Sequence, residues 1–512
     1  MTGKKKVIIF YPDSLPKGRL YIENMTPVSA LCAVRSLDRS RYDLKVITRF
    51  INGDDYLDQI LEHCRDAIVF GVSSFIGYQI KEGIRVSKEV KRRYPELPII
   101  WGGWFPSSAP ELTLNNNFVD MVAIGQGEHT MAELIDSLEK RVALEGIAGL
   151  WFKNERGEII RNKSRPFIDL NELPPIPYDL LEGANLVYNM DGFRTIDYMT
   201  SYGCPHRCTF CCEPAVNKRR WSGLSPQRII EDLEYLQEKF NVEAVTLLDT
   251  NTFTDAKRIR EFCNLYIKKG LKIRFTMTCG KISHLIKFDD ELWELIGKAN
   301  MSRIQVGLES GTQEYLALLQ KDNKVEDVLA VLRKAHQFNV TLFVSTMIGI
   351  PTADIETELN SNLDLINQIL EISDKNKFSM YLYTPLPATT LLPLSEKEGF
   401  VPPKTLEEWG EYDFSKKSVP WITPYYIKLL YKLQFYFKYI LVKDLIYATP
   451  SPILRTIYRA VYAIFNPIAK LRFKNNFFSL PVDYYFLKFC VNIGQRMQVF
   501  IDRVTANMRQ RI

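Results

Sequence analysis

The stretch "YMTSYGCPHRCTFCCEP", residues 198–214, holds four of the nine cysteines of this 512-residue chain. Cys204, Cys208 and Cys211 are spaced C-x3-C-x2-C, and Cys212 follows directly. Structural zinc sites close four ligands, usually as two pairs separated by a long loop, whereas three thiolates on one short loop leave a metal centre with a vacancy. The spacing therefore favours an iron-sulfur cluster with one open iron.

The alternative is a zinc knob formed by the same three cysteines with Cys212 and His206. Adjacent Cys211 and Cys212 are poorly placed to share one tetrahedron, so we expect Cys212 to line the site without ligating. The remaining cysteines lie in apolar contexts and are expected to be small core residues: Cys32, Cys64, Cys263, Cys279 and Cys490.

The chain around the cysteines repeats strand and helix over about two hundred residues. A first strand at 195–200 precedes the cysteines, and amphipathic helical segments separate the later apolar runs. Those runs are 244–248, 273–278, 304–308, 341–348 and 378–383. We expect residues 191–400 to form a full or partial TIM-type barrel, with its chemistry at the carboxyl ends of the strands.

Residues 1–150 show a second alternating series, which predicts an α/β, doubly wound, Rossmann-like domain. The expected strands are 7–11, 44–48, 67–73, 98–101 and 121–124, and the expected helices are 27–37, 54–64, 77–93 and 128–140. Thr26 is a candidate N-cap of the first helix, with Pro27 at its first position. Small residues follow three of the strands, at 71–75, 102–106 and 125–129, which favours a binding crevice there.

A proline-rich connector at 167–183 predicts a linker over residues 151–190, because Pro174, Pro175 and Pro177 forbid regular helix. Residues 401–512 then form an aromatic, basic region with a helical period. Residues 421–512 contain 14 Lys and Arg against 3 Asp and Glu, a net charge of +11, whereas residues 1–420 carry 52 against 57, a net charge of −5. Lysines and arginines interrupt every apolar run of this region, so we expect no membrane span.

Two interpretations of the basic C-terminal region remain open. Its helices either pack as a cap on the barrel with their charges in solvent, or make peripheral contact with a membrane surface. Nucleic acid fits less well, because the charges are interleaved with apolar helix positions. The apolar run after the basic N-terminus is too short for a signal peptide, so we expect a cytoplasmic protein, with membrane association as the alternative.

The cysteine spacing, with an aromatic residue, Phe210, before the last cysteine, resembles the radical S-adenosylmethionine enzymes. This resemblance implies a 4Fe-4S cluster held by Cys204, Cys208 and Cys211. The open iron would chelate S-adenosylmethionine, and an electron from the cluster would cleave it to a 5'-deoxyadenosyl radical.

Other stretches resemble this family in the same order. In "QVGLESGT", Glu309 and Ser310 fall where the family contacts the ribose of S-adenosylmethionine. In "MIGIP", Gly349 and Pro351 fall where its backbone faces adenine. For each match, a turn or helix cap is the alternative.

Two further stretches depart from the usual family pattern. "LLDTNTF" replaces the GGE stretch, so Asp249 and Asn251 are the candidates for the amino-group contact. "YTPLPATTL" resembles a P-x-P-G-T loop with Ala388 in place of glycine, which puts its backbone conformation in question because alanine tolerates positive φ poorly.

The order of the two domains is similar to the cobalamin-dependent class of this family, over residues 5–395. No D-x-H-x-x-G loop is present, so either cobalamin binds without a protein histidine below cobalt or the domain has lost it. We expect bound cobalamin, with its nucleotide tail near Gly71, Ser73, Ser74, Gly102 and Gly103.

The resemblance implies an enzyme that methylates an unactivated carbon of a hydrophobic small molecule or lipid, with a reductant such as flavodoxin or ferredoxin. One alternative is a ring-forming cyclase of the anaerobic Mg-protoporphyrin type. A non-catalytic cluster or cobalamin sensor is another. A methylthio transferase fits less well, because a second N-terminal cysteine set is missing.

Overall fold

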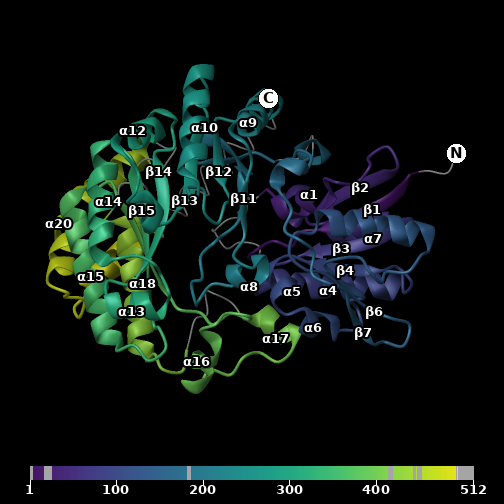
Figure 1. The fold of residues 1–512 in the computed structure, drawn as a ribbon. Helices are drawn as coiled ribbons and strands as arrows, with labels where there is room; N and C mark the ends of the chain where they lie inside the picture. The colour runs from purple at the N-terminus through teal and green to yellow at the C-terminus, as the bar shows by residue number, and fades with distance from the viewer. Residues whose placement is uncertain are drawn as a thin grey trace.

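A computed structural model describes residues 4–16, 26–181, 186–412, 419–441, 446, 452–491 and 493. Two seven-stranded sheets organise these residues. Figure 1 shows the N-terminal sheet at the right and the second sheet at the left, with the short helix α8 (Glu213–Asn217) between them.

The N-terminal sheet has the strand order 2-1-3-4-5-6-7. Its strands are β1 (Lys5–Phe10), β2 (Tyr42–Ile47), β3 (Ala67–Ser73), β4 (Ile99–Gly102), β5 (Met121–Ala123), β6 (Leu150–Lys153) and β7 (Ile159–Arg161). The first five are parallel, and the chain reverses direction across the sheet between β1 and β3. This arrangement confirms the predicted doubly wound domain, whose ligand site lies beyond the carboxyl ends of the strands.

Helices cover both faces of this sheet. They are α1 (Val28–Val34), α2 (Arg49–Asn52), α3 (Tyr56–Cys64), α4 (Tyr78–Arg93), α5 (Trp104–Ser108), α6 (Pro110–Leu114) and α7 (Glu128–Lys140). Buried residues of α1 and α7 join one core with one face of the sheet, while those of α3 and α4 join the core on the other face.

Strands β6 and β7 extend this sheet beyond the domain boundary expected at residue 150. They run antiparallel, β6 beside β5 and β7 beside β6. Both are very short, so an apolar periodicity could not develop. The expected linker therefore begins after Arg161, and it contains the 3-10 turns η1 (Leu170–Glu172) and η2 (Tyr178–Leu181).

The second sheet is a half-barrel of six parallel strands with an antiparallel strand at its edge. Its strands are β8 (Tyr188–Met190), β9 (Phe193–Tyr198), β12 (Ala244–Leu247), β13 (Arg274–Gly280), β14 (Arg303–Glu309), β15 (Thr341–Ile348) and β16 (Lys377–Leu382). The expected partial barrel is confirmed. A separate two-stranded ribbon, β10 (Ser201–Gly203) with β11 (Trp221–Gly223), flanks the cysteine loop.

The helices of the barrel begin and end at residues suited to these positions. They are α9 (Pro226–Phe240), α10 (Ala256–Lys269), α11 (Ile282–Leu285), α12 (Asp290–Lys298), α13 (Gln313–Leu318), α14 (Val325–Gln337), α15 (Ile355–Ile372) and α16 (Leu392–Lys397). Ser225 caps α9 by accepting from Arg228 N, and Pro226 occupies the first helical position. Asp255 caps α10, which ends at Gly270 with a φ of 68°. These caps satisfy backbone groups that helix ends leave unpaired.

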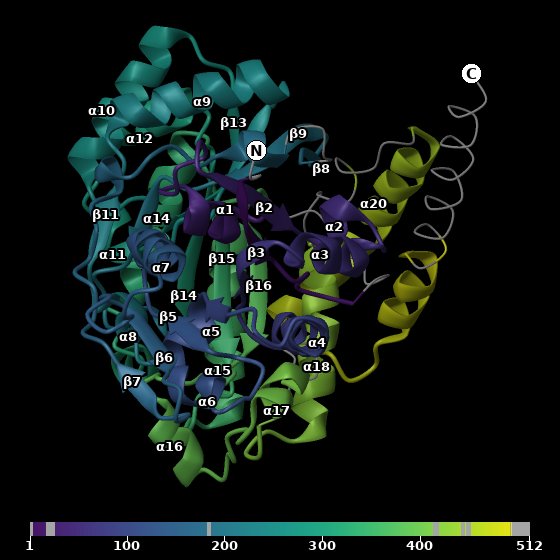
Figure 2. The same ribbon diagram turned by 90° about the vertical axis from the view of Figure 1, so that its right-hand side faces the viewer.

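The C-terminal region contributes three further bounded helices: α17 (Leu406–Glu411), α18 (Pro424–Tyr439) and α20 (Pro452–Lys474). Helix α17 crosses back to the N-terminal domain and packs on α4, with Trp409 in the core there. Helix α18 packs beside β16 (Figure 2), and α20 packs on α15. In the described part of the chain, the helices lack the combination of length and hydropathy that crossing a bilayer requires.

Thr26 joins the two domains instead of capping a helix, so the predicted N-cap is wrong. Pro27 is the residue at the N-cap of α1, where no side chain caps the helix. Thr26 N donates to Asp197 Oδ2 at 2.8 Å, and Thr26 Oγ1 accepts from Asp197 N at 3.2 Å. Tyr188 donates to the other carboxyl oxygen of Asp197 at 2.5 Å. These bonds hold the start of α1 against the first barrel strand.

We predict that Asp197 makes stability depend on pH. Burial raises the pKa of Asp197 to about 7 from 3.8, against the lowering effect of its bonds to Tyr188 and Thr26. The folded state therefore keeps a proton that the unfolded chain releases, so stability falls as pH rises from about 4 to about 7 and is level above that. Thermal unfolding midpoints over this pH range should decline in the wild type and stay flatter in Asp197→Asn.

Asp197→Ala is the matched comparison, because it removes both acceptors and leaves Thr26 N–H unpaired in a buried place. We expect a loss of about 1–3 kcal/mol relative to Asp197→Asn at every pH. An unchanged pH slope in Asp197→Asn would contradict the assignment of the titration to this carboxyl.

Candidate cluster loop and interdomain cavity

The cysteine loop starts where β9 ends, and a buried carboxylate fixes that strand end. Asp249 accepts from Thr200 N at 2.7 Å, from the Thr200 hydroxyl at 2.5 Å and from Ser201 N at 3.0 Å. Arg258 is also buried and donates to Thr200 O at 2.7 Å. Both oxygens of Asp249 are therefore occupied by the protein in this structure.

Asn251 lies beside Asp249 in the sequence but has an acceptor to spare. Its side chain is buried, and Oδ1 has no hydrogen-bond partner. The amide nitrogen lies 3.4 Å from His284 Nδ1. Of the two candidates for the amino-group contact, Asn251 thus presents the unsatisfied acceptor that an ammonium group would need.

Cys204, Cys208 and Cys211 are free, partly buried thiols on one loop. Cys208 interacts electrostatically with each of the other two. Burial raises the pKa of the Cys204 and Cys211 thiols, and a bound iron ion would favour their thiolate forms. Three thiols that share one loop, with no disulfide among them, fit a cluster with three protein ligands.

Lys321 and Glu309 form a shielded ion pair beside this loop. Their side chains are 10% and 13% exposed, and Nζ lies 2.8 Å from Oε1. Burial is the largest single influence and would lower the pKa of Lys321, but the charge and hydrogen bond of Glu309, together with the nearby Cys208 and Cys211, outweigh it and raise this pKa. Lys321 Nζ also lies 5.7 Å from the ring centre of Phe210. Glu309 has a φ of 73°, which only a small share of non-glycine residues adopt.

A chain of polar side chains connects the loop to α11. His206 Nε2 lies 3.2 Å from His284 Nε2, and His206 Nδ1 lies 3.5 Å from Asp322. Lys281 Nζ donates to Asp322 at 3.2 Å. Burial, with Lys281 and His284 nearby, lowers the pKa of His206 to about 4, so the His206 ring is neutral at neutral pH.

Helix α15 braces the ends of β14 and β15 through two buried side chains. Glu358 accepts from Gly349 N at 2.6 Å and from Ile350 N at 3.4 Å. Asn362 donates to Met347 O at 2.9 Å and accepts from Gly311 N at 2.7 Å. Trp421 Nε1 donates to Gly349 O at 2.9 Å, so both backbone groups of Gly349 are already paired. Nearby Ser310 and Pro351 are buried.

The loop that contains Ala388 keeps the conformation expected of glycine. Ala388 has a φ of 60°. Two bonds hold this loop on the cysteine loop: Leu391 N donates to Thr209 O at 3.0 Å, and Thr390 Oγ1 lies 3.4 Å from the same oxygen. Thr209 is the residue between Cys208 and Phe210, so these bonds also position the cysteine loop.

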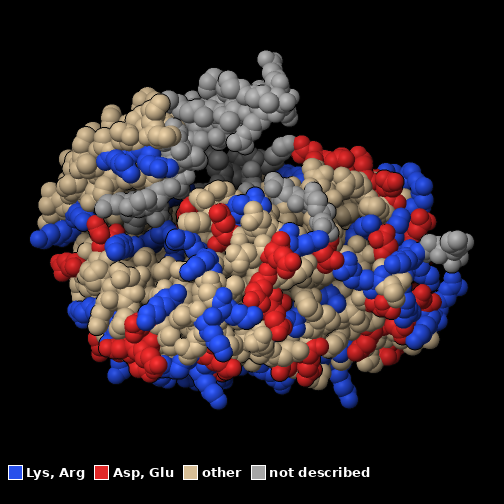
Figure 3. Space-filling view, turned by 90° about the horizontal axis from the view of Figure 1, so that it is seen from above, with Lys and Arg blue, Asp and Glu red and all other residues tan. Residues whose placement is uncertain are grey.

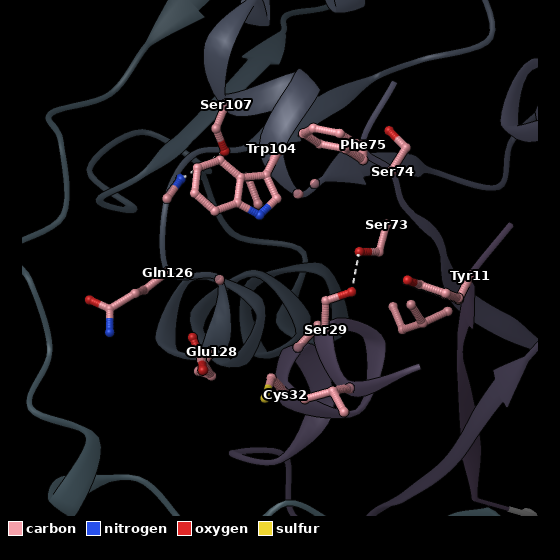
Figure 4. A pocket seen from close by; sticks show the side chains of 18 of the residues that line it. Tyr11, Ser29, Cys32, Ser73, Ser74, Phe75, Trp104, Ser107, Gln126 and Glu128 are labelled. Atoms are coloured by element: carbon pink, nitrogen blue, oxygen red, sulfur yellow. Dashed lines mark hydrogen bonds between the residues drawn. The ribbon is translucent and has the colours of Figure 1, made fainter. Parts of the chain in front are cut away.

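A cavity of about 280 Å³ lies between the two domains. Figure 4 shows it from close by, with Tyr11 and Ser73 projecting from strand ends of the N-terminal sheet and Trp104 from the start of α5. The barrel side of the wall comes from β10, α8 and the end of β12, including Tyr202 and Val216. The cavity therefore adjoins both ends of the segment that carries the cysteines.

All five residues expected near the cobalamin tail line this cavity: Gly71, Ser73, Ser74, Gly102 and Gly103. Ser73 shares a hydrogen bond of 2.9 Å with Ser29 (Figure 4). The Ser74 hydroxyl is buried without a partner, as expected of a polar group that meets a ligand. The described lining residues include no histidine, so they offer no imidazole as a lower cobalt ligand. The cavity fits a cofactor bound by small residues and backbone.

The structure brings the sequence-predicted residues into two places. The first place is the cysteine loop, which carries the three cysteines and Phe210 and has Asn251 and Glu309 close to it. The second is the set of strand ends of the N-terminal sheet, where the five cavity residues lie. Sequence analysis missed Lys321, Lys281, His284, Glu358 and Asn362. None of these belongs to a motif recognised in the sequence, and Lys281, His284 and Asn362 each have a partner at least 41 residues away.

Family models match both domains of this chain. The radical SAM superfamily model matches residues 198–360, which include the three cysteines. The B12 binding domain model matches residues 23–135, which include α1 and strands β2 to β5. The expected cofactors are therefore confirmed: a 4Fe-4S cluster, S-adenosylmethionine and cobalamin.

Relatives support the same conclusion over most of the chain. An uncharacterized methyltransferase of Pyrococcus horikoshii, PH0819, is 27% identical over 391 residues, 75% of this chain and 82% of the relative. An anaerobic magnesium-protoporphyrin IX monomethyl ester cyclase of Synechocystis sp. is 23% identical over 65% of this chain and 67% of the relative. A hopanoid C-3 methylase of Methylococcus capsulatus is 24% identical over 69% of this chain and 66% of the relative.

Solved structures share the whole two-domain fold. The cobalamin-dependent S-adenosylmethionine radical enzyme OxsB, with aqua-cobalamin bound, superposes with a TM-score of 0.70 at 18% identity, over 92% of this chain and 72% of its own. The radical S-adenosylmethionine methyltransferase TsrM from Kitasatospora setae superposes with a TM-score of 0.62 at 16% identity, over 77% of this chain and 75% of TsrM. At these identities the likeness concerns the fold.

We predict that Glu358→Gln is tolerated and that Glu358→Leu is not. Burial raises the pKa of Glu358 to about 8, against the lowering effect of its bonds to Gly349 and Ile350. At neutral pH the carboxyl is thus largely protonated, and the single acceptor oxygen of glutamine can keep the short bond from Gly349 N while losing the long contact with Ile350 N. Leucine leaves two buried N–H groups unpaired, which costs about 1–3 kcal/mol and displaces the turn after β15.

The measurements for Glu358 are the thermal midpoint and the rate of 5'-deoxyadenosine formation after anaerobic cluster reconstitution. Glu358→Gln should stay within about twofold of the wild-type rate, while Glu358→Leu should lose about tenfold or more. Equal rates in the two variants would show that the brace does not position the site.

Two adjacent glycines at the end of β4 provide a matched pair. Gly103 has a φ of 99°, and an added Cβ would lie 2.5 Å from Ser74 O, whereas a Cβ on Gly102 would meet only Ala123 atoms at 3.8 Å or more. We expect Gly103→Ala to lose about 1–3 kcal/mol of stability and much of its bound cobalamin. Gly102→Ala should keep its unfolding midpoint.

Cobalamin content of the reconstituted protein, read from its absorption spectrum, completes this test. If Gly102→Ala loses cobalamin but not stability, the cofactor packs directly against residue 102. Full cobalamin content in Gly103→Ala would contradict the assignment of this strand end to the cofactor.

Proposed function

We propose that this chain, which belongs to the cobalamin-dependent radical S-adenosylmethionine enzymes, methylates an unactivated carbon of a hydrophobic small molecule or lipid. The observation that carries this proposal is the cavity shared by the two domains. Its walls come from the strand ends of the cobalamin domain on one side and from the segments flanking the cysteine loop on the other. Cobalamin held at these strand ends would face the cysteine loop, so a substrate bound next to it would lie within reach of both cofactors.

The names of several relatives support methyl transfer. The Pyrococcus horikoshii relative and the hopanoid C-3 methylase are both named for it, and so is a cytidylyl-2-hydroxyethylphosphonate methyltransferase of Streptomyces wedmorensis, at 20% identity. The hopanoid enzyme is named for a lipid substrate. When bound, the cluster and S-adenosylmethionine supply a radical that abstracts hydrogen, and cobalamin supplies the methyl group.

The chain's own residues contribute binding, orientation and exclusion of water. Val28, Val72, Met131 and Met199 give the cavity wall a largely apolar surface, which suits a hydrophobic substrate. The unpaired Asn251 Oδ1 is available to hold the amino group of S-adenosylmethionine. A protein reductant such as flavodoxin or ferredoxin would supply electrons to the cluster.

The test is anaerobic reconstitution with iron, sulfide and hydroxocobalamin, followed by mass spectrometry of an assay with S-adenosylmethionine and a reductant. We predict that the wild type forms both 5'-deoxyadenosine and methylated cobalamin. Cys208→Ala should abolish 5'-deoxyadenosine, because the cluster loses one of its three thiolates. Cys212→Ala is the matched control: this cysteine is buried next to the ligands, and its removal should leave 5'-deoxyadenosine formation intact.

The other outcomes point to the alternatives. Deoxyadenosine without methylation of cobalamin would favour a ring-forming cyclase, the activity named for the Synechocystis relative. Neither product, with a cluster present, would indicate a sensor. Neither product, with co-purified zinc, would make the cysteine loop structural.

Substrate class is tested with S-adenosylmethionine that carries a deuterated methyl group. The active protein is incubated with the lipid fraction or the aqueous fraction of a cell extract. Mass spectrometry then identifies compounds whose mass has increased by one labelled methyl group. Label confined to the lipid fraction is expected. Label confined to the aqueous fraction would overturn the lipid part of the proposal while leaving methyl transfer intact.

A further inference from the structure

Helix α20 carries apolar side chains on two opposite faces. One face is buried: Ala469 and Phe473 join the core of the barrel, and Leu454 lies in a small separate cluster with Ile446. The other carries exposed apolar side chains at spacings of four, seven, four and three residues: Ile453, Ile457, Ile464, Ile468 and Leu471. At 100° per residue these five fall in one narrow stripe. A surface helix normally turns a polar face outward.

The next helical segment, residues 482–491, repeats the arrangement. Tyr484, Leu487 and Val491 are buried on one side. Exposed apolar side chains share the opposite side: Val482, Tyr485, Phe486, Phe489 and Ile493. Phe486 packs against Phe465 of α20, with ring centres 5.7 Å apart. The two exposed stripes therefore belong to neighbouring helices.

Basic residues flank these stripes and acidic ones are scarce. Helix α20 contains five Lys and Arg and no Asp or Glu. Lys474 is exposed on one flank of its stripe, Arg459 is exposed further round the same side of the helix, and Lys488 is exposed on the following helix. Asp483, the acidic residue in the next segment, is already bound by Arg472 and by Tyr436. In Figure 3 the surface over α20, at the upper left, is almost entirely tan with one blue group, unlike the mixed charges elsewhere.

We propose that the outer faces of α20 and of residues 482–491, the outer apolar face, dock the protein on the surface of an anionic lipid bilayer. An apolar stripe edged by lysine and arginine is the pattern of helices that lie in the interface of a membrane. Basic residues add attraction to anionic headgroups, and Tyr and Phe side chains suit the boundary between headgroups and acyl chains. The proposal does not depend on the nature of the substrate.

Charge favours lipid over a second copy of the chain. A symmetric dimer through this face would bring the basic flanks of two copies together, because a two-fold interface pairs the same surface with itself. Asp483, the acidic residue of this segment, is already paired with Arg472. The basic side chains of two copies would therefore meet without a compensating negative charge. Residues 494–512 contain four Arg and one Asp, so they do not supply the missing negative charge. The headgroups of an anionic bilayer supply this negative charge.

The test is flotation of the full-length protein with vesicles of phosphatidylcholine alone, or of two parts phosphatidylcholine and one part phosphatidylglycerol. We expect the wild type to float with the anionic vesicles at low ionic strength. Binding should be weaker with phosphatidylcholine alone and at high ionic strength, because salt screens the attraction of the basic flanks.

Ile468→Glu and Ile267→Glu are a matched pair, since each replaces a helical isoleucine that is 39% exposed. Ile468 lies in the outer apolar face, and Ile267 lies on α10. Ile468→Glu should reduce vesicle binding roughly tenfold, and Ile464→Glu with Leu471→Glu should abolish it. Ile267→Glu should bind like the wild type. Lys474→Gln with Lys488→Gln should weaken binding to anionic vesicles only.

Each variant is also assayed for 5'-deoxyadenosine and for its mass in solution. Retained deoxyadenosine formation shows that a variant is folded, and it separates this proposal from the proposed methyl transfer. A wild type that stays with neither kind of vesicle overturns the proposal. A wild-type dimer that Ile468→Glu converts to a monomer, without vesicle binding, would assign the face to self-association instead.

Discussion

The carboxylate of Asp249 is the constraint on which the site depends. A buried carboxylate is tolerated only when its oxygens are hydrogen-bonded, and here the donors are the two peptide groups and the hydroxyl at the end of β9. Arg258 holds the same strand end from the other side, through Thr200 O. The direction in which the chain leaves β9 is thereby fixed. The cysteine loop and the barrel side of the cavity both start from that point.

The sequence predicted those parts of the fold that local patterns determine. The limits expected for β3, β15 and α7 match the structure, because apolar periodicity defines them. What local patterns could not predict depends on partners far away in the chain. Thr26 has the chemistry of an N-cap, yet Asp197, 171 residues later, takes its backbone N–H. Likewise, the sequence of α17 does not indicate that this helix packs on α4 of the N-terminal domain.

The same division applies to the candidate site. The three cysteines and the small residues at the strand ends could be found from sequence, because their spacing and size form patterns that a short stretch of sequence already shows. Glu358 and Asn362 could not, because they bind backbone groups at the ends of β14 and β15 that only the folded chain brings to them; Gly311, for example, lies 51 residues from Asn362. Asp249 was found for a different role from the one its hydrogen bonds indicate. A motif therefore identifies the residues near a ligand better than it identifies what each residue does.

Ala388 shows how long-range contacts override local preference at this site. An alanine with positive φ is strained by roughly 1 kcal/mol or more relative to glycine, so the conformation must be held from outside. The bonds from Leu391 and Thr390 to Thr209 do this, and they tie the loop to the residue between Cys208 and Phe210. The cysteine loop is thus positioned from both sides, by the end of β9 and by the loop after β16. Asp249, Arg258 and Leu391, which hold the cysteine loop in these two ways, lie outside the lining of the cavity.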